Sequence, residues 1–116
     1  MPNSVYYCRT ERLDELEPVL VRFVTALGRS MTDIADESPE SLTELVTGLW
    51  PDVPAAALRS ATGRLLASRT WETTSVDPAA CNRWTGILQD AGLVTAAPAF
   101  EALISTRITD AARVPA

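Results

Sequence analysis

Apolar residues recur at intervals of three and four positions over most of the chain, which is the period of a helix with one buried face. The most regular stretch follows Pro18, and polar residues such as Arg22 and Arg29 fall between its apolar positions. Those apolar positions are Leu20, Phe23, Val24, Leu27, Met31, Ile34 and Ala35. The pattern predicts a helix over about 18–36, preceded by a short helix over about 11–16.

Proline directly after a capping residue marks two further helix starts. Ser38 precedes Pro39, and Asp77 precedes Pro78. Ser and Asp side chains accept hydrogen bonds from the free N–H groups of a first turn, where proline fits because it has no N–H group. The apolar stripes along the chain then predict four more helices, over about 39–50, 54–67, 78–91 and 98–104.

For the helix predicted over 78–91, the sequence indicates both the buried face and the residue at which the helix ends. Cys81 and Trp84 lie on its apolar side, so we expect both to be buried. Gly92 follows the last periodic residue and suits the left-handed conformation of a Schellman-type helix end. Trp50, at the end of another predicted helix, is also expected to pack against the rest of the chain.

The first residues favour a different structure. Val5, Tyr6 and Tyr7 belong to a run of β-formers that predicts one short strand over about 4–9. A lone strand cannot satisfy its own backbone groups, and no second convincing strand follows. The predicted fold is therefore mainly α, with one short N-terminal strand followed by four to five helices. We expect residues 1–116 to be a single unit that is an incomplete domain.

Charge and composition exclude several classes of partner. The formal net charge is −5, and all ten basic residues are arginines scattered along the chain. No basic stripe exists to follow a phosphate backbone or an anionic membrane surface, so we expect no nucleic-acid partner. No apolar run reaches the roughly 18 residues of a membrane span, so we expect no direct membrane insertion. The start of the chain lacks the pattern of a secretory signal, which predicts a cytoplasmic location as written.

The residues that carry chemistry are few. The chain has no histidine, which removes the commonest general base and metal ligand. Cys8 and Cys81 are interpreted as small buried apolar residues, with a disulfide left open. Carboxylates four apart, such as Asp33 and Glu37, are interpreted as solvated surface groups instead of an acid–base pair. We expect no enzyme activity, no cofactor and no metal.

Trp71 is the weak candidate for a ligand-binding residue. It stands in the polar loop over 68–76, where an exposed indole ring can stack on a ligand or a partner. The competing interpretation is that Trp71 anchors the loop by folding back onto the helices. No other ligand-binding residue can be named from the sequence.

An ordered series of motifs resembles a known protein family. The series runs from about Val5 to Arg107 and begins with the helix text Glu17-Pro18-Val19-Leu20-Val21-Arg22-Phe23-Val24-Thr25-Ala26-Leu27. It continues with Met31, Ile34, Ser38-Pro39-Glu40, Trp50-Pro51-Asp52-Val53-Pro54, Asp77-Pro78-Ala79-Ala80, Arg83, Ile87-Leu88-Gln89-Asp90-Ala91-Gly92-Leu93 and Ala102-Leu103-Ile104-Ser105-Thr106-Arg107. These motifs are similar to the carboxy-terminal part of ABC-transporter solute-binding proteins of the nitrate/sulfonate/taurine and thiamine-pyrimidine-precursor type.

The resemblance implies a fold and a function. Proteins of that family have a two-lobed α/β fold, the type II periplasmic-binding-protein fold. They close around a small organic solute in the periplasm or at the cell surface and present it to an ABC permease. This chain would be a truncated substrate-binding component, with helices that cover a β-layer it does not supply. Because the family's pocket lies mostly in the absent part, no ligand residue carries over.

Two other function classes stay open. The alternative is a stand-alone small helical domain that presents an apolar groove to a partner protein. An enzyme is the least favoured class, because the histidine-dependent signature of the one catalytic branch of the resembled family is missing.

Overall fold

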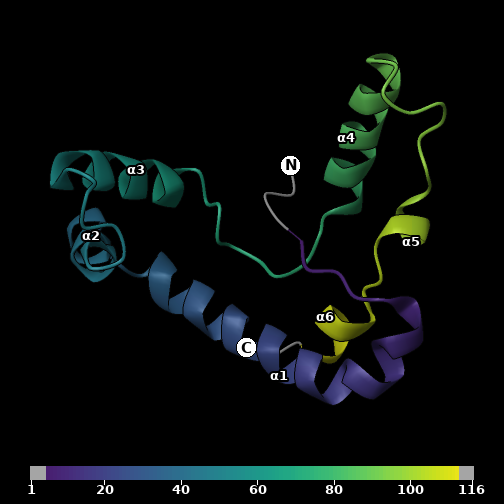
Figure 1. Ribbon diagram of the computed structural model, residues 1–116, viewed down its shortest axis with the longest axis horizontal. Coiled ribbons are helices and arrows are strands. Elements are labelled where there is room, and N and C mark those ends of the chain that lie inside the picture. The colour runs from purple at the N-terminus through teal and green to yellow at the C-terminus, as the bar shows by residue number, and fades with distance from the viewer. Residues whose placement is uncertain (1–4, 113–116) are drawn as a thin grey trace. The chain divides into compact units, whose positions relative to one another are not determined.

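A computed structural model describes residues 5–112, and its regular elements in that range are all helices (Figure 1). A 3₁₀-helix, η1, covers Thr10–Arg12 and leads into the longest helix. The α-helices are α1 (Leu13–Ala35), α2 (Pro39–Thr47), α3 (Ala55–Ala67), α4 (Pro78–Asp90), α5 (Phe100–Leu103) and α6 (Arg107–Ala111). The prediction of a mainly helical protein is confirmed.

The chain divides into two compact units, each with its own small core. The central unit is Ala26–Thr73, and the terminal unit combines the described residues of Met1–Thr25 with those of Thr74–Ala116. The helix α1 passes from one into the other. The buried residues of the central unit are Leu42, Thr43, Leu58 and Thr62, and those of the terminal unit are Cys81, Thr85, Phe100, Ile108 and Ala112.

The predicted N-terminal strand is wrong. Residues 5–9 form no strand, and Ser4, where the prediction began, lies outside the described residues. A strand needs a partner for its backbone groups, and the described residues include none. Tyr6 packs instead on a helix, with its ring edge-on to that of Phe23 at a centroid distance of 4.9 Å.

The helix boundaries differ from the predicted ones at two prolines. The two helices expected over 11–16 and 18–36 are largely one, because α1 continues through Pro18. Proline removes one hydrogen-bond donor and its ring crowds the carbonyl of Asp14, four residues earlier, which bends a helix, but a helix with an apolar stripe on both sides of it can persist. At the other site α2 ends at Thr47 instead of about residue 50. Pro51 disfavours helical backbone at the residue before it.

The predicted helix caps are confirmed. The Ser38 hydroxyl accepts a hydrogen bond from the Ser41 N–H group at 3.1 Å, at the start of α2. The Asp77 carboxylate accepts two from the first turn of α4, at 3.0 and 3.1 Å. Gly92 has φ +70° and closes α4 as a Schellman motif, in which its own N–H group bonds Gln89 at 2.9 Å.

Trp84, expected to be buried, and Trp50, expected to pack against the rest of the chain, are both partly exposed. In α4 the buried row is Cys81 and Thr85, four residues apart, and this rotates Trp84 partly into solvent at 40 % exposure. Thr85 tolerates burial because its hydroxyl donates to the Asn82 carbonyl at 3.1 Å. Trp50 is 52 % exposed. A periodic pattern shows that residues share a face, but not which edge of that face a neighbour covers.

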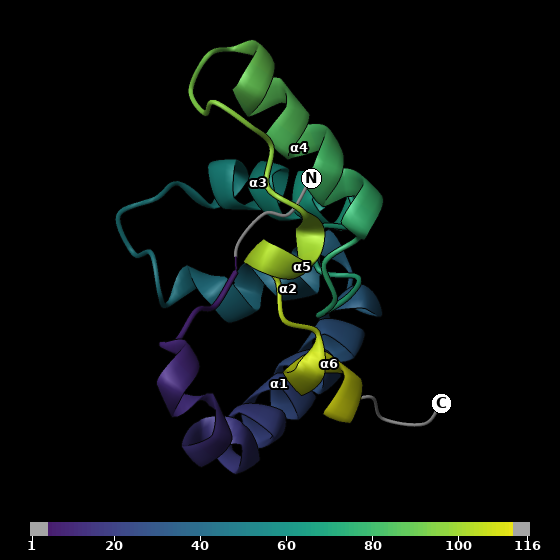
Figure 2. The same cartoon turned by 90° about the vertical axis from the view of Figure 1, so that its right-hand side faces the viewer.

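The helices α2 and α3 pack against each other within the central unit (Figures 1 and 2). A buried pair of hydroxyls joins them, since Thr43 and Thr62 lie 3.0 Å apart. The Thr43 hydroxyl donates to the Pro39 carbonyl at 2.5 Å, which makes the Thr62 hydroxyl the donor within the pair. No described buried side-chain oxygen or nitrogen lacks a hydrogen-bond partner, so these threonines belong to a satisfied core.

A matched pair of glycine substitutions tests this packing. A Cβ atom at Gly63, inside α3, would lie 3.8 Å from the Pro39 Cβ, which is ordinary contact. We expect Gly63→Ala to raise the free energy of unfolding by about 0.5–1 kcal/mol, because alanine favours a helix interior more than glycine does. Gly92→Ala should lower it by about 1 kcal/mol, because alanine is strained at positive φ. Urea unfolding measures both, and destabilisation by Gly63→Ala would contradict the α2–α3 contact.

Candidate functional site

A hollow of about 330 Å³ lies within the central unit. It is bounded by the last turns of α1, by the end of α3 and by the loop that follows α3. The lining residues are Met31, Thr32, Ile34, Ala35, Asp36, Leu65, Leu66, Arg69, Trp71 and Glu72. The volume is at the lower end of the range for small-molecule sites and is large enough for one bulky apolar side chain of a partner.

The walls of the hollow are mainly apolar. Met31 and Ile34 are three residues apart and therefore share one side of α1. Leu65 and Leu66 belong to the last turn of α3, and Trp71 comes from the loop. Each of these five side chains is half-buried. They pack on the protein on one side while still presenting apolar surface to an incoming group.

The loop folds back over the end of α3 because of one unusual residue. Arg69 has φ 53°, the left-handed region that favours glycine. Its N–H group donates to the Leu66 carbonyl at 3.0 Å, and that of Thr70 donates to Leu65 at 3.3 Å. These bonds form a Schellman motif with arginine at the position where glycine is usual. The turn places Trp71 at the hollow.

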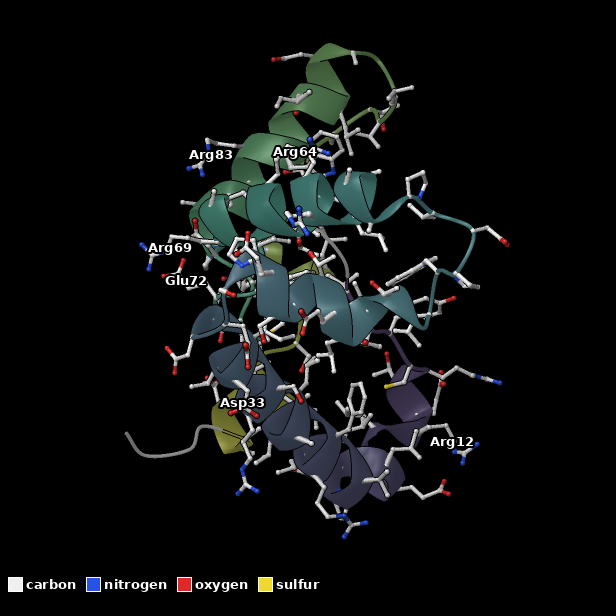
Figure 3. All side chains as sticks on the ribbon, turned by 90° about the vertical axis from the view of Figure 1, so that its left-hand side faces the viewer. Arg12, Asp33, Arg64, Arg69, Glu72 and Arg83 are labelled. Atoms are coloured by element: carbon white, nitrogen blue, oxygen red, sulfur yellow. The ribbon has the colours of Figure 1, made fainter. Side chains whose placement is uncertain are left out.

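Charged side chains form the rim of the hollow. Arg69 donates a hydrogen bond to the Glu72 carboxylate, and Figure 3 shows these two side chains next to each other. Asp36 adds a second carboxylate to the lining. The hollow thus combines an apolar wall with a partly neutralised, net acidic rim, which suits an apolar group attached to a polar or cationic one.

The structure also places the other residues singled out from the sequence. Trp71 is half-buried and lines the hollow, so it is packed on the chain on one side and accessible on the other. Cys81 is buried as expected, whereas Cys8 is exposed, and both are free thiols. Asp33, labelled in Figure 3, and Glu37 are exposed, which fits their interpretation as solvated surface groups.

The sequence did not predict a charge cluster in the terminal unit. Arg107, the first residue of α6, donates to the Asp14 carboxylate at 2.6 Å and to Glu17. The hydrogen bond to Glu17, and then that to Asp14, raises the pKa of Arg107. This contact connects α6 to the start of α1, which lie side by side in Figures 1 and 2. Ile108 and Ala112, four apart and both buried, are the only sequence signal for α6.

Two further kinds of site are absent from the described part of the chain. Within residues 5–112, no three or more cysteine or acidic side chains are placed to hold a metal ion. None of the helices there combines the length and apolar content needed to cross a membrane. Comparison with protein-family models, with curated protein sequences and with solved structures finds no match for this chain.

Substitution of Arg69 tests whether the turn beside the hollow is strained. Left-handed backbone costs a non-glycine residue about 1 kcal/mol, and an exposed ion pair contributes less than that. We expect Arg69→Gly to raise the free energy of unfolding by about 0.5 kcal/mol. Arg69→Ala keeps the strain and loses the ion pair with Glu72, so it should be slightly destabilising. Thermal unfolding measures the order of stability, which should be Arg69→Gly, wild type, then Arg69→Ala. The reverse order would contradict a strained left-handed turn at Arg69.

Proposed function

We propose that this chain is a non-catalytic protein-interaction domain, whose helices pack against a partner polypeptide through apolar side chains exposed in the free chain. The supporting observation is the exposure of large apolar residues on more than one helix. Leu45 of α2 is 71 % exposed, and Ile87 of α4 is 57 % exposed. Single exposed leucines are ordinary on protein surfaces. Here α4 carries two, Trp84 and Ile87, and two more, Leu49 and Trp50, follow Leu45 just beyond the end of α2, which is typical of surfaces that a partner covers.

The hollow beside Trp71 adds a second feature that suits this function. Anchor residues of protein interfaces insert bulky side chains into small apolar recesses. A hollow of about 330 Å³, with one indole ring and five aliphatic or thioether side chains in its wall, has the size and chemistry of such a recess.

Chemical unfolding of the isolated chain and of surface variants tests the proposal. An interaction domain must fold by itself, so guanidinium unfolding followed by near- and far-ultraviolet circular dichroism should show one or two cooperative transitions. Replacing Leu45 or Ile87 by serine should change the free energy of unfolding by less than about 0.5 kcal/mol each. A broad transition with no near-ultraviolet signal would contradict an independent domain.

A second candidate is the substrate-binding component, in truncated form, of an ABC transporter for a small organic or sulfonate- or nitrate-like solute. The observation that favours it is the same exposed apolar surface on α2 and α4, because such helices would cover the sheet of a larger two-lobed protein. In this candidate the partners of the whole protein are the solute and a membrane permease. The surface that covers the apolar residues of α2 and α4 would then belong to the same protein instead of a separate partner.

The two candidates predict different behaviour of the isolated chain. A part of a solute-binding protein should bind the dye ANS strongly and melt without cooperativity, because the β-sheet that its helices would cover is missing. Neither candidate predicts tight binding of sulfonates, nitrate or pyrimidines by these residues alone. Isothermal titration with those solutes tests this, and tight binding would contradict both.

A further inference from the structure

The lining of the hollow beside Trp71 contains a carboxylate without a counter-ion. Asp36, Glu72 and Arg69 are the charged residues of the lining, and their net charge is −1. Arg69 already donates a hydrogen bond to Glu72. Within residues 5–112, Asp36 takes part in no ion pair. Its side chain is exposed, so water solvates this charge in the free chain.

Two helix ends add to the negative potential of the hollow. Asp36 directly follows the last residue of α1, where free carbonyl groups carry partial negative charge, and the last turn of α1 has no basic residue. The helix α3 also ends at the hollow, and the arginine of its last turn, Arg64, donates to Ser60 at 2.7 Å. An acidic residue at the C-terminus of a helix is unfavourable for that helix. Local helix stability therefore does not account for Asp36.

The charge at the rim restricts which side chain of a partner can fill the hollow. A purely apolar side chain would expel water from the rim and leave the Asp36 carboxylate with neither solvent nor a counter-ion, which is costly. An acidic side chain would meet Asp36 and the helix ends with like charge. A basic side chain can pair with Asp36 while its apolar stem lies against the apolar wall.

We propose that the hollow binds an arginine side chain of the partner polypeptide. A planar guanidinium group can stack on an indole ring and bond both oxygens of a carboxylate, which an ammonium group cannot do. Trp71 and Asp36 provide the ring and the carboxylate in one lining. The methylene groups of the arginine would contact the apolar wall. This inference rests on the proposed interaction function and names the anchor residue that the hollow receives.

Four short peptides that differ at one residue test this inference. They are blocked at both ends and carry arginine, lysine, citrulline or leucine between glycines. Citrulline is the matched control for arginine, because it has nearly the same shape and no charge. NMR of methyl-labelled methionine reports the binding, since Met31 lines the hollow and the chain has one other methionine.

The arginine peptide should bind at least about fivefold more tightly than the citrulline or leucine peptide, with the lysine peptide second. Raising the salt from about 50 to about 500 mM should reduce the preference for arginine over citrulline.

A pair of aspartate variants tests the role of the rim charge. Asp36→Asn should reduce the preference for arginine over citrulline to less than about twofold. This variant should stay folded, because it removes an acidic group from a helix C-terminus. The control Asp33→Asn makes the same change of charge three residues earlier, at an exposed residue that does not line the hollow. It should retain the preference.

A pair of aromatic variants tests the role of the indole ring. Trp71→Leu keeps an apolar side chain in the lining and should weaken binding of the arginine peptide about fivefold. The control Tyr7→Leu replaces an aromatic residue that is 96 % exposed and belongs to the other unit. It should change the affinity less than about twofold. Circular dichroism checks that each variant is folded.

The unfavourable outcomes separate this inference from the proposed function. Equal binding of the arginine and citrulline peptides, tightest binding of the leucine or lysine peptide, no binding of the arginine peptide, or an unchanged preference in Asp36→Asn would overturn the inference. The proposed function itself is tested by the unfolding experiment, which contains no peptide, so the two can fail independently.

Discussion

Replacing Leu42 by alanine should lower the free energy of unfolding of the central unit by about 3 kcal/mol. Leu42 is the most buried apolar residue described, at 3 % exposure, and it lies in α2 beside the buried hydroxyl of Thr43. Truncation removes the transfer free energy of its side chain and leaves a cavity between α2 and α3. Small domains are stable by only about 5–15 kcal/mol, so this loss is a large fraction of the total.

The control for Leu42→Ala is the same substitution three residues later. Leu45→Ala changes the same atoms on the same helix at an exposed position, so its effect should stay within about 0.5 kcal/mol. Amide hydrogen exchange gives the readout, because protection in α2 and α3 reports the free energy of opening that pair. Equal effects of the two substitutions would show that the orientation of α2 is wrong.

Phe100→Ala should have a comparable effect in the terminal unit, with a loss of about 3–5 kcal/mol. Phe100 is 7 % exposed and is the only buried aromatic residue among those described. It opens α5, a helix of 4 residues, which is far too short to form without packing. The loss of this anchor should therefore release α5 as well as open a cavity.

The control for Phe100→Ala is Leu103→Ala in the same helix. Leu103 is half exposed, so its truncation should cost less than about 1 kcal/mol. Near-ultraviolet circular dichroism and urea unfolding measure both variants. If Leu103→Ala were the more damaging substitution, the buried face of α5 would be misassigned.

Local signals in the sequence predicted the local structure well. Ser38 and Asp77 cap their helices as expected, and Gly92 adopts positive φ. These features depend on chemistry within four or five residues, which a single sequence contains in full. The amphipathic period identified the helices for the same reason, since it depends on spacing alone.

Features that depend on distant neighbours were not predictable in this way. The run of β-formers near Tyr6 forms no strand, because no described segment pairs with it. Trp84 lies at the edge of its helix face instead of the centre, because the neighbours cover Cys81 and Thr85. Arg107 contacts Asp14, which is more than ninety positions away in the sequence. No local sequence pattern predicts that contact.

One residue of the hollow was singled out from the sequence, and its role in ligand binding stays a prediction. Trp71 stood out as a tryptophan in a polar loop, and it does line the hollow. The turn that places Trp71 at the hollow has Arg69 at a position where glycine is usual. The sequence therefore gave no signal for this turn. Strained backbone of this kind tends to occur at functional sites, which supports the hollow as a candidate site.

Solvent accessibility of leucine methyl groups tests the central claim most directly. A soluble gadolinium chelate speeds the relaxation of exposed methyl groups in NMR spectra of the leucine-labelled chain. In the free chain the methyl groups of Leu45 and Leu49 should relax fast and those of Leu42 slowly. Protection of Leu45 and Leu49 already in the free chain would contradict an apolar face held open for a partner.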